Sequence, residues 1–463
     1  MNRYLVAVLA IILCGYLLEL AASLLNLRAL DPKLPDGFRD VLDAQKYAKS
    51  QEYTRVTTRF AMVREAVTTL LTVAFILAHG FNLLDIMARS IGHGTLGTGL
   101  LFIGLLLLLA GLVNLPFAVY STFVIEERFG FNRTTVRTFI ADIAKSLLLA
   151  VLLGAPLLAA VLWFFEAAGS MAWLYCWVVL VLFVLIFQFL APVVIMPLFN
   201  RFTPLEDGEL KQMILDYARG RGFAVQGIYT MDGSRRSTRP NAFFTGLGRF
   251  RRIVFFDTLL QRLTPGEILA VLAHETGHWK LHHLLRMMAA TILQMGLMLY
   301  ILSLLLGNRL LFDAFGMEHV SVYAGLVFFG FLYAPVSSLF SVVLNRISRS
   351  HEYQADAYAV RTTGRAEELI SGLKKLGAEN LVNLTPHPLV VALHYSHPPL
   401  LERIRAIREL AGRPAEQAAA AEGEPCDLCG RRVASRSLQY DEQSGRVLCP
   451  DCLAEEEACG CEG

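Results

Sequence analysis

Seven apolar stretches, each about the length of a membrane-spanning helix, restrict this chain more than any other feature. A helix needs roughly 20 consecutive apolar residues to cross a bilayer, where it must satisfy its own backbone hydrogen bonds. The chain is 55% hydrophobic and only 18% charged, which is too apolar for a soluble protein of this length. We therefore predict a mainly α-helical integral membrane protein. The predicted spans are Tyr4–Leu25, Val67–Met87, Leu96–Ile125, Leu147–Phe165, Met171–Met196, Leu284–Leu306 and Val320–Leu344.

The first stretch can be interpreted in two ways. Asn2 and Arg3 before it, with Ala21, Ala22 and Ser23 near its end, loosely fit a cleaved signal peptide. Its apolar run is longer than the core of a typical signal peptide, which favours a retained membrane anchor.

Basic residues alternate between the loops. The segment 26–65 and the loops after the third and fifth predicted spans are rich in Lys and Arg, whereas the other loops carry Arg89, Arg309 or neither. Because Lys and Arg concentrate on the cytoplasmic side, we predict an outside N-terminus and a cytoplasmic C-terminus. The chain has no basic tract and a net charge of +2, so we expect no nucleic-acid partner.

A His-Glu-x-x-His motif stands at 274–278, just before the sixth predicted span. Thr264-Pro265-Gly266-Glu267 predicts the start of a helix here, with Thr264 as N-cap and Glu267 closing a capping box. On a helix, residues four apart share a face, so His274 and His278 can bind one zinc ion and Glu275 can act as a base. The motif therefore predicts a zinc peptidase with its site on the cytoplasmic side, although it also occurs by chance on helices.

A catalytic zinc site needs a third protein ligand and one open position. A His at position 284 would indicate a metzincin, but that residue is Leu284, which excludes the class. His282 lies about 12 Å along the helix axis from His274, too far to share its ion, and we expect it to be solvated. The downstream candidates are His351, Glu352, Asp356, His387, His394 and His397.

Glu352 and Asp356 are spaced four residues apart and share a helix face. One of them can bind zinc while the other orients a ligand imidazole, whereas His351 lies about 100° around the helix from Glu352. The alternative is a solvated acidic face. The small apolar residues that follow, such as Ala355, favour close packing over open water.

Several motifs, in order, resemble those of the type I CAAX prenyl endopeptidases, a family of seven-span membrane zinc metalloproteases. The resemblance covers most of residues 1–412. Its motifs are Phe123-Val124-Ile125-Glu126-Glu127-Arg128-Phe129-Gly130-Phe131-Asn132, Asp232-Gly233-Ser234-Arg235-Arg236-Ser237, Asn241-Ala242-Phe243-Phe244, Arg252 to Leu260, His274 to Lys280, Glu352 to Ala357 and Ser396 to Arg403.

The resemblance implies a role for each residue of the zinc motifs. His274, His278 and Glu352 would be the ligands of a catalytic zinc ion, and Glu275 would be the general base. Asp356 would lie behind a ligand and orient it. The spans would enclose a large chamber capped by the zinc-metallopeptidase domain, which contains a small β element.

The resemblance also implies that Asn241 and His397 line the site and donate hydrogen bonds to developing negative charge. On its residue chemistry alone, His397 fits a capping or core histidine equally well. We expect a peptide or protein substrate, membrane-associated or free. The family member would be bacterial and would lie in the inner membrane, or in the endoplasmic reticulum membrane if the source is eukaryotic.

The domain organisation follows from these observations. Residues 1–198 would form the first five spans, and 199–412 the metallopeptidase domain with the last two spans. Residues 413–425, rich in Ala, Glu, Gly and Pro, read as a flexible linker, and 426–463 as a Cys-rich tail.

The tail carries Cys426-x-x-Cys429 and Cys449-x-x-Cys452, separated by 19 residues. This spacing is typical of a zinc site, and four thiolate ligands indicate a structural ion. Two disulfides are the alternative, but a cytoplasmic tail is reducing. So short a segment needs the metal to fold, and it could recruit a protein partner.

The combined prediction is a membrane zinc metalloendopeptidase that processes membrane proteins or takes part in their quality control. The alternative is a catalytically silent membrane scaffold that recruits partners through its zinc tail. A transporter fits less well, because substrate paths need polar groups at depth and Glu19 and Glu166 lie only near span ends.

Overall fold

The computed structural model describes residues 2–91, 94–221, 226–245 and 252–412. In the tail it describes only 424–425, 428, 432–433, 439–441, 446–448 and 452. The chain divides into two compact units, Met1–Leu401 and Glu402–Gly463.

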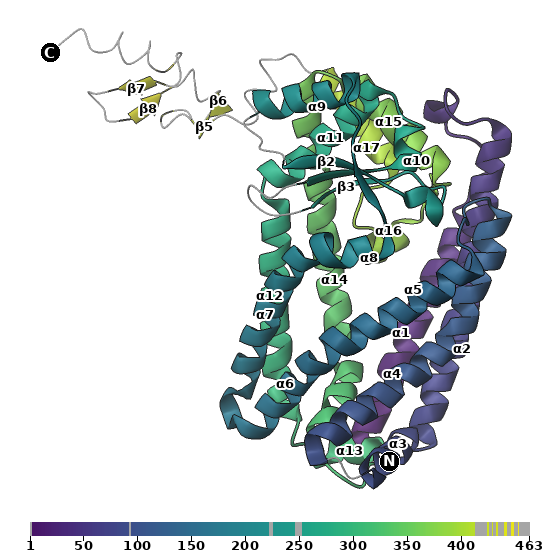
Figure 1. The fold of residues 1–463 in the computed structure, drawn as a ribbon, viewed down its shortest axis with the longest axis vertical. Helices are drawn as coiled ribbons and strands as arrows, with labels where there is room; N and C mark the ends of the chain where they lie inside the picture. The colour runs from purple at the N-terminus through teal and green to yellow at the C-terminus, as the bar shows by residue number, and fades with distance from the viewer. Residues whose placement is uncertain are drawn as a thin grey trace. The chain divides into compact units, whose positions relative to one another are not determined.

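Seven helices in the described part are long and apolar enough to cross a membrane, which confirms the predicted number. Several consist of consecutive helical segments: the wide π-helical turns η3 and η5 each join two helices, and η2 follows α4 at the end of its span. Figure 1 shows the long helices side by side. The seven are α1 (Arg3–Arg28), α2 (Ala44–Leu77), α4 with η2 (Gly94–Glu126), α5 with η3 and α6 (Val136–Ala167), η4 with α7, η5 and α8 (Gly169–Phe199), α12 (His283–Leu305) and α14 (Val322–Thr363).

The second span differs from its prediction at Val67–Met87. Helix α2 begins at Ala44 and ends at Leu77, and a separate helix α3 (Gly80–Ser90) follows. Between them His79 adopts a left-handed backbone conformation with a φ of 54°, which turns the chain. Hydropathy marks only the apolar part of a helix, so the polar first half of α2 was missed. A left-handed His is also hard to foresee, because glycine is the usual residue there.

The remaining elements of the larger unit lie between and after these spans. The short helices are η1 (Asp36–Phe38), α9 (Glu209–Gly220), η6 (Gly233–Arg235), α10 (Asp257–Leu260), α11 (Pro265–Lys280), α13 (Arg309–Ala314), α15 (Ala366–Glu379) and α16 (Pro388–His394). The strands are β1 (Phe202–Pro204), β2 (Gly227–Met231), β3 (Ala242–Thr245) and β4 (Arg252–Phe256).

The four strands form one small sheet in the order β1-β2-β4-β3. Strands β2 and β4 are parallel, and β1 and β3 pair antiparallel with them at the two edges. Ile253, Val254 and Phe255 of β4 are each only 1% exposed, because this apolar run is covered on both faces. The predicted small β element is therefore present.

Helix α11, which carries the zinc motif, packs closely against α14. A Cβ atom added at Gly277 would lie 3.0 Å from the Cα of Ala355, so the two backbones approach as closely as these small residues permit. The opposite face of α11 buries Ile268, Leu269 and Leu272 in an apolar cluster with the sheet.

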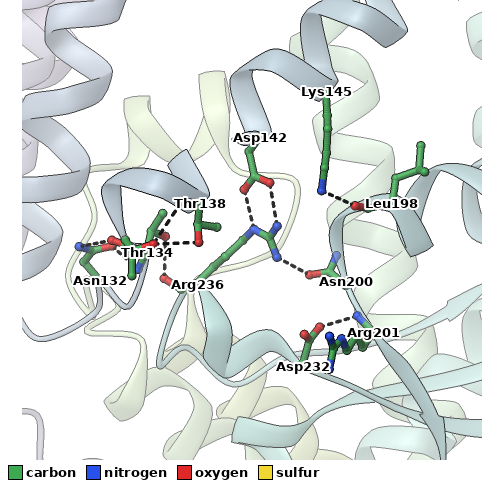
Figure 2. A network of polar contacts seen from close by, with 11 residues as sticks. Asn132, Thr134, Thr138, Asp142, Lys145, Leu198, Asn200, Arg201, Asp232 and Arg236 are labelled. Atoms are coloured by element: carbon green, nitrogen blue, oxygen red, sulfur yellow. Dashed lines mark hydrogen bonds and ion pairs between the residues drawn. The ribbon is translucent and has the colours of Figure 1, made fainter. Parts of the chain in front are cut away.

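Arg236 joins the peptidase part to the membrane helices (Figure 2). Its guanidinium donates two hydrogen bonds to Asp142 of α5, at 2.8 and 2.9 Å, and a third to Asn200 Oδ1 at 2.9 Å. A bidentate pair of this kind fixes orientation as well as position. Arg236 belongs to one of the motifs that carry the family resemblance, and its role here is structural.

A second junction is built around Arg239. Its guanidinium lies 4.1 Å from the ring centroid of Phe131 and contacts both carboxylate oxygens of Glu126, at 3.0 and 3.2 Å. Tyr53 of α2 donates to the same carboxylate at 2.6 Å. Three segments far apart in the sequence are thereby held at one point.

The second unit contains most of α17 (Leu400–Ala411), which follows His397-Pro398-Pro399. Strands β5 (Glu424–Pro425) and β6 (Arg432–Val433) pair antiparallel, as do β7 (Gln439–Asp441) and β8 (Arg446–Leu448). Cys452 is buried, whereas Cys426, Cys429 and Cys449 lie outside the described residues. The predicted four-Cys zinc module is therefore untested.

The start of α11 is held by the predicted capping box and by α15. The Thr264 backbone N–H donates to Glu267 at 2.8 Å, and Ser371 and Lys375 donate to the same carboxylate at 2.6 and 2.9 Å. Glu267 is only 4% exposed. Burial raises its pKa, but the hydrogen bonds from Lys375, Ser371 and Thr264 outweigh burial, and the pKa is lowered overall.

This arrangement predicts a pH-dependent contribution to stability. Glu267→Gln should lower the free energy of unfolding at pH 7 by about 2 kcal/mol, the usual size of a hydrogen-bonded buried charge. Because the pKa of Glu267 is lowered in the folded state, its contribution is complete above the unfolded pKa and is lost as the pH falls below it. The difference between the wild type and the variant should therefore stay constant from pH 7 down to about the usual glutamate pKa of 4.5 and shrink as the pH falls further, through the lowered pKa of the folded state.

Unfolding of the detergent-purified protein, followed at several pH values, measures this difference. Glu367→Gln, at an exposed position in the first turn of α15, is the matched control and should leave stability unchanged. A difference between wild type and Glu267→Gln that stays constant with pH would contradict the assignment.

Candidate active site

His274 and His278 lie one turn apart on α11, on the side that faces α14. Their Nε2 atoms are 3.2 Å apart. The His274 side chain is 9% exposed and that of His278 is 26% exposed. The helix thus presents both imidazoles at one point, as the spacing predicts.

Glu352 of α14 completes a group of three donors. Its Oε2 lies 3.5 Å from His274 Nε2, and its Oε1 lies 3.3 Å from His278 Nε2. One ligand atom from each residue falls within 4.8 Å of the others. Donor atoms about 2.0 to 2.1 Å from a tetrahedral zinc ion are about 3.3 Å from each other. Two imidazoles and one carboxylate at these distances fit a catalytic zinc site with an open position.

Asp356 lies one turn after Glu352, on the same face of α14. Its Oδ1 is 2.8 Å from Nδ1 of His274, and its side chain is 1% exposed. A carboxylate on the far nitrogen of a ligand imidazole fixes the tautomer and the ring orientation. Asp356 therefore contacts His274 on the ring nitrogen that points away from Glu352, and its role in orienting a ligand stays a prediction.

His397 follows α16 and reaches the same group. Its Nε2 is 3.2 Å from Glu352 Oε1, and its side chain is 65% exposed. Ser396 Oγ lies 3.0 Å from its Nδ1. An exposed imidazole in contact with the buried donor group can meet a substrate, so its position fits the site better than a core histidine.

Helix α14 also positions the segment that carries His397. Arg349 donates to the backbone carbonyls of Val391 and Tyr395 at 2.9 and 2.6 Å, and Asn345 donates to that of Leu393 at 2.8 Å. These carbonyls lie in the last turn of α16 or just after it, where the helical hydrogen bonds end, and that of Val391 also accepts from the Tyr395 N–H at 3.2 Å. Helix α14 therefore supplies Glu352 and also holds the segment that carries His397.

The positions of two other predicted site residues, Glu275 and Asn241, are less well defined relative to the three donor side chains. Glu275 is half-buried and directly follows His274 on α11. Asn241 is exposed at the start of β3, where its side chain accepts a hydrogen bond from the Ala242 N–H at 2.8 Å. In the described part of the chain, its carbonyl oxygen also accepts from the Phe256 N–H at 3.0 Å. Contact between Asn241 and the donor group stays a prediction.

Comparison with known proteins identifies the family. The family model described as CAAX prenyl protease N-terminal, five membrane helices, matches residues 23–201, and Peptidase family M48 matches residues 204–411. The CAAX prenyl protease 1 homolog of Oryza sativa subsp. japonica is 36% identical over 418 residues, which cover 88% of this chain and 97% of that protein. This chain belongs to the type I CAAX prenyl protease family, within the M48 peptidases.

Two further relatives agree with this assignment. The CAAX prenyl protease 1 of Saccharomyces cerevisiae is 37% identical over 407 residues, which cover 81% of this chain and 89% of that protein. The crystal structure of S. mikatae Ste24p matches this M48 protease with a TM-score of 0.84 at 34% identity, covering 88% of this chain and 99% of that one.

Family membership confirms the main functional prediction. The protein is an integral membrane zinc metalloendopeptidase. The comparisons give no support to a catalytically silent scaffold. The predicted bacterial origin is not borne out, because the relatives named above come from a plant and two yeasts.

One residue of this M48 protease site was missed at the sequence level. His283, the first residue of α12, is 3% exposed, and its Nδ1 lies 3.1 Å from Nδ1 of His278. His282 is exposed, as expected, but it has a left-handed φ of 57° that separates α11 from α12. A continuous helix would not bring residue 283 back beside His278. In the sequence, the only indication of this contact was the adjacent pair His282-His283, just after the helix that carries the zinc motif.

Proposed function

We propose that His274, His278 and Glu352 hold the catalytic zinc ion of this protease. The observation that carries the proposal is the separation of their donor atoms, 3.2 to 3.5 Å, in a largely buried position between α11 and α14. When bound, zinc polarises a substrate carbonyl and makes water nucleophilic at neutral pH.

The other side chains would handle protons and developing charge. Glu275 would take a proton from the attacking water and deliver it to the leaving amine. His397 would donate from Nε2 to the oxygen of the tetrahedral intermediate, a contribution of about 3 kcal/mol for a well-placed donor. Asn241 would be a second such donor. Asp356 would keep His274 in the tautomer whose Nε2 is available.

For the substrate, we propose the carboxyl-terminal peptides of prenylated proteins. The names of the relatives and the 97% coverage of the rice protein support this class. Cleavage of membrane-protein segments in quality control is the second candidate, and a peptide series with and without a prenyl group separates the two. The basic loops support a cytoplasmic site.

We further propose that the spans enclose a chamber beside the peptidase domain. Between 0% and 17% of the residues in the apolar windows of the seven spans are buried inside the structure. Helices in a tightly packed bundle would bury a larger share of their surface against one another. Low burial is the result expected if one side of each span faces lipid and another faces an internal space.

Substituting Glu275 tests the assignment of the base. Glu275→Gln should reduce peptide cleavage by at least ~10²-fold, since a general base contributes about that much, while zinc stays bound through the unchanged ligands. Cleavage of a prenylated peptide and metal analysis of the same preparation measure both quantities. Glu367→Gln is the control, and turnover near the wild-type rate in Glu275→Gln would remove the proposed role.

Substituting Glu352 tests the ligand set. Glu352→Ala should lose both zinc and activity, because two imidazoles would remain as protein ligands. Metal analysis after dialysis against a weak chelator checks this. If zinc remained at full occupancy, another residue would be the third ligand. His351 is the neighbour to consider, although its ring stacks on His283 with a centroid distance of 4.0 Å.

For the tail we propose a second, structural zinc ion bound by Cys426, Cys429, Cys449 and Cys452. The full chain should then contain two zinc ions, and Cys426→Ser with Cys429→Ser should contain one and keep its peptidase activity in detergent. Metal-to-protein ratios measure this directly. Two zinc ions in the double variant would refute the site, and loss of activity would show that the tail acts on the peptidase.

A further inference from the structure

We propose that His283 is a positioning residue for the zinc site, which fixes the tautomer and ring orientation of His278. The inference rests on the proposed role of His278 as a zinc ligand. It adds a role for the residue that contacts the other ring nitrogen of His278. A hydrogen-bond chain runs from His278 through His283 and Gln354 to Ser350.

The distances place His283 between the ligand and α14. Its Nδ1 is 3.1 Å from Nδ1 of His278, and its Nε2 is 3.1 Å from Oε1 of Gln354. Gln354 Nε2 lies 3.4 Å from Ser350 Oγ. Because His283 is only 3% exposed, water has little access to the position that its ring fills.

The direction of the protons follows from the ligand atom. Nε2 of His278 faces Glu352 and His274, so a neutral ring that binds zinc through Nε2 carries its proton on Nδ1. His278 then donates to His283 Nδ1, which must be unprotonated. His283 therefore holds its proton on Nε2 and donates to the carbonyl oxygen of Gln354. The Gln354 amide can then donate to Ser350, so one direction satisfies every member of the chain.

Ring packing and backbone geometry hold His283 in this place. The His351 ring stacks on it with a centroid distance of 4.0 Å and an angle of 8° between the planes. The left-handed conformation of His282, with a φ of 57°, reverses the chain so that His283 lies beside His278. A non-glycine residue in this conformation costs about 1 kcal/mol or more, and the contact with His278 is what this conformation provides.

The two histidines of the zinc motif are thus supported by different chemistry. Nδ1 of His274 faces the carboxylate of Asp356 at 2.8 Å, whereas Nδ1 of His278 faces a second imidazole. A carboxylate adds negative charge behind the ligand, while a neutral acceptor contributes orientation and tautomer alone. Loss of such an outer partner typically costs 10- to 100-fold in metal affinity.

The test measures zinc affinity of the full-length protein in detergent, by competition with a chelator of known affinity. His283→Leu removes the acceptor and should weaken zinc binding by roughly 10- to 100-fold. His283→Asn keeps an acceptor near the position of Nδ1 and should recover most of the affinity. His282→Asn changes an exposed neighbour at a left-handed position that Asn tolerates, and it should match the wild type.

Two further variants keep the result interpretable. Gln354→Leu, at an exposed position, breaks the chain one bond further out and should weaken zinc binding several-fold even if His283→Leu does not fold. His278→Ala tests the ligand assignment itself. Zinc affinity unchanged in His278→Ala would overturn the proposed ligand set.

Loss of affinity in His278→Ala together with wild-type affinity in His283→Leu and Gln354→Leu would overturn the positioning role alone. A third result would also overturn it: a lowered unfolding midpoint of the metal-free His283→Leu protein, with no recovery of zinc affinity in His283→Asn, would assign His283 to packing. Recovery by His283→Asn with equal metal-free midpoints is the outcome that the proposal requires.

Discussion

The proposed zinc-binding group depends on the close approach of α11 and α14. Gly277 is the fourth residue of the His-Glu-x-x-His motif, and a Cβ at this position would lie 3.0 Å from the Ala355 Cα. A larger residue would push the helices apart, and each donor pair across the interface, at 3.3 to 3.5 Å, would open by a similar amount. A metal ion tolerates only a few tenths of an ångström in ligand distance. The small residues between the two helices are therefore as necessary to the site as the ligands themselves.

Features that depend only on residues close together in the sequence were predicted correctly. The capping box at Thr264 and Glu267 follows from a short-range rule, and it is present. The spacing of Glu352 and Asp356 correctly placed both on one face of α14, although it carries no information on their distance from α11. The small sheet and the number of spans also follow from local patterns.

The parts that the sequence did not reveal depend on the backbone at single residues or on contacts across the fold. His79 and His282 both adopt a left-handed conformation, which a histidine in the sequence does not indicate. The first ended a span earlier than hydropathy indicated, and the second brought His283 against His278. The contact between His397 and Glu352 depends on Arg349, which binds the end of α16 from 42 to 46 positions away in the sequence. No periodicity in the chain encodes that contact.

Helix α14 is continuous over 42 residues, from Val322 to Thr363, and includes both a membrane span and Glu352. Glu352 lies eight residues beyond Leu344, the end of the predicted apolar stretch, which is about 12 Å along the helix. With Glu352 as the proposed zinc ligand, the reacting bond would be presented at a set height above the apolar stretch. A substrate held in the bilayer by its own anchor can be cut only if the chain between anchor and scissile bond spans that height. Substrates would then be selected by the distance of the scissile bond from the membrane as well as by side-chain identity. The length of α14 beyond its apolar stretch would set that distance.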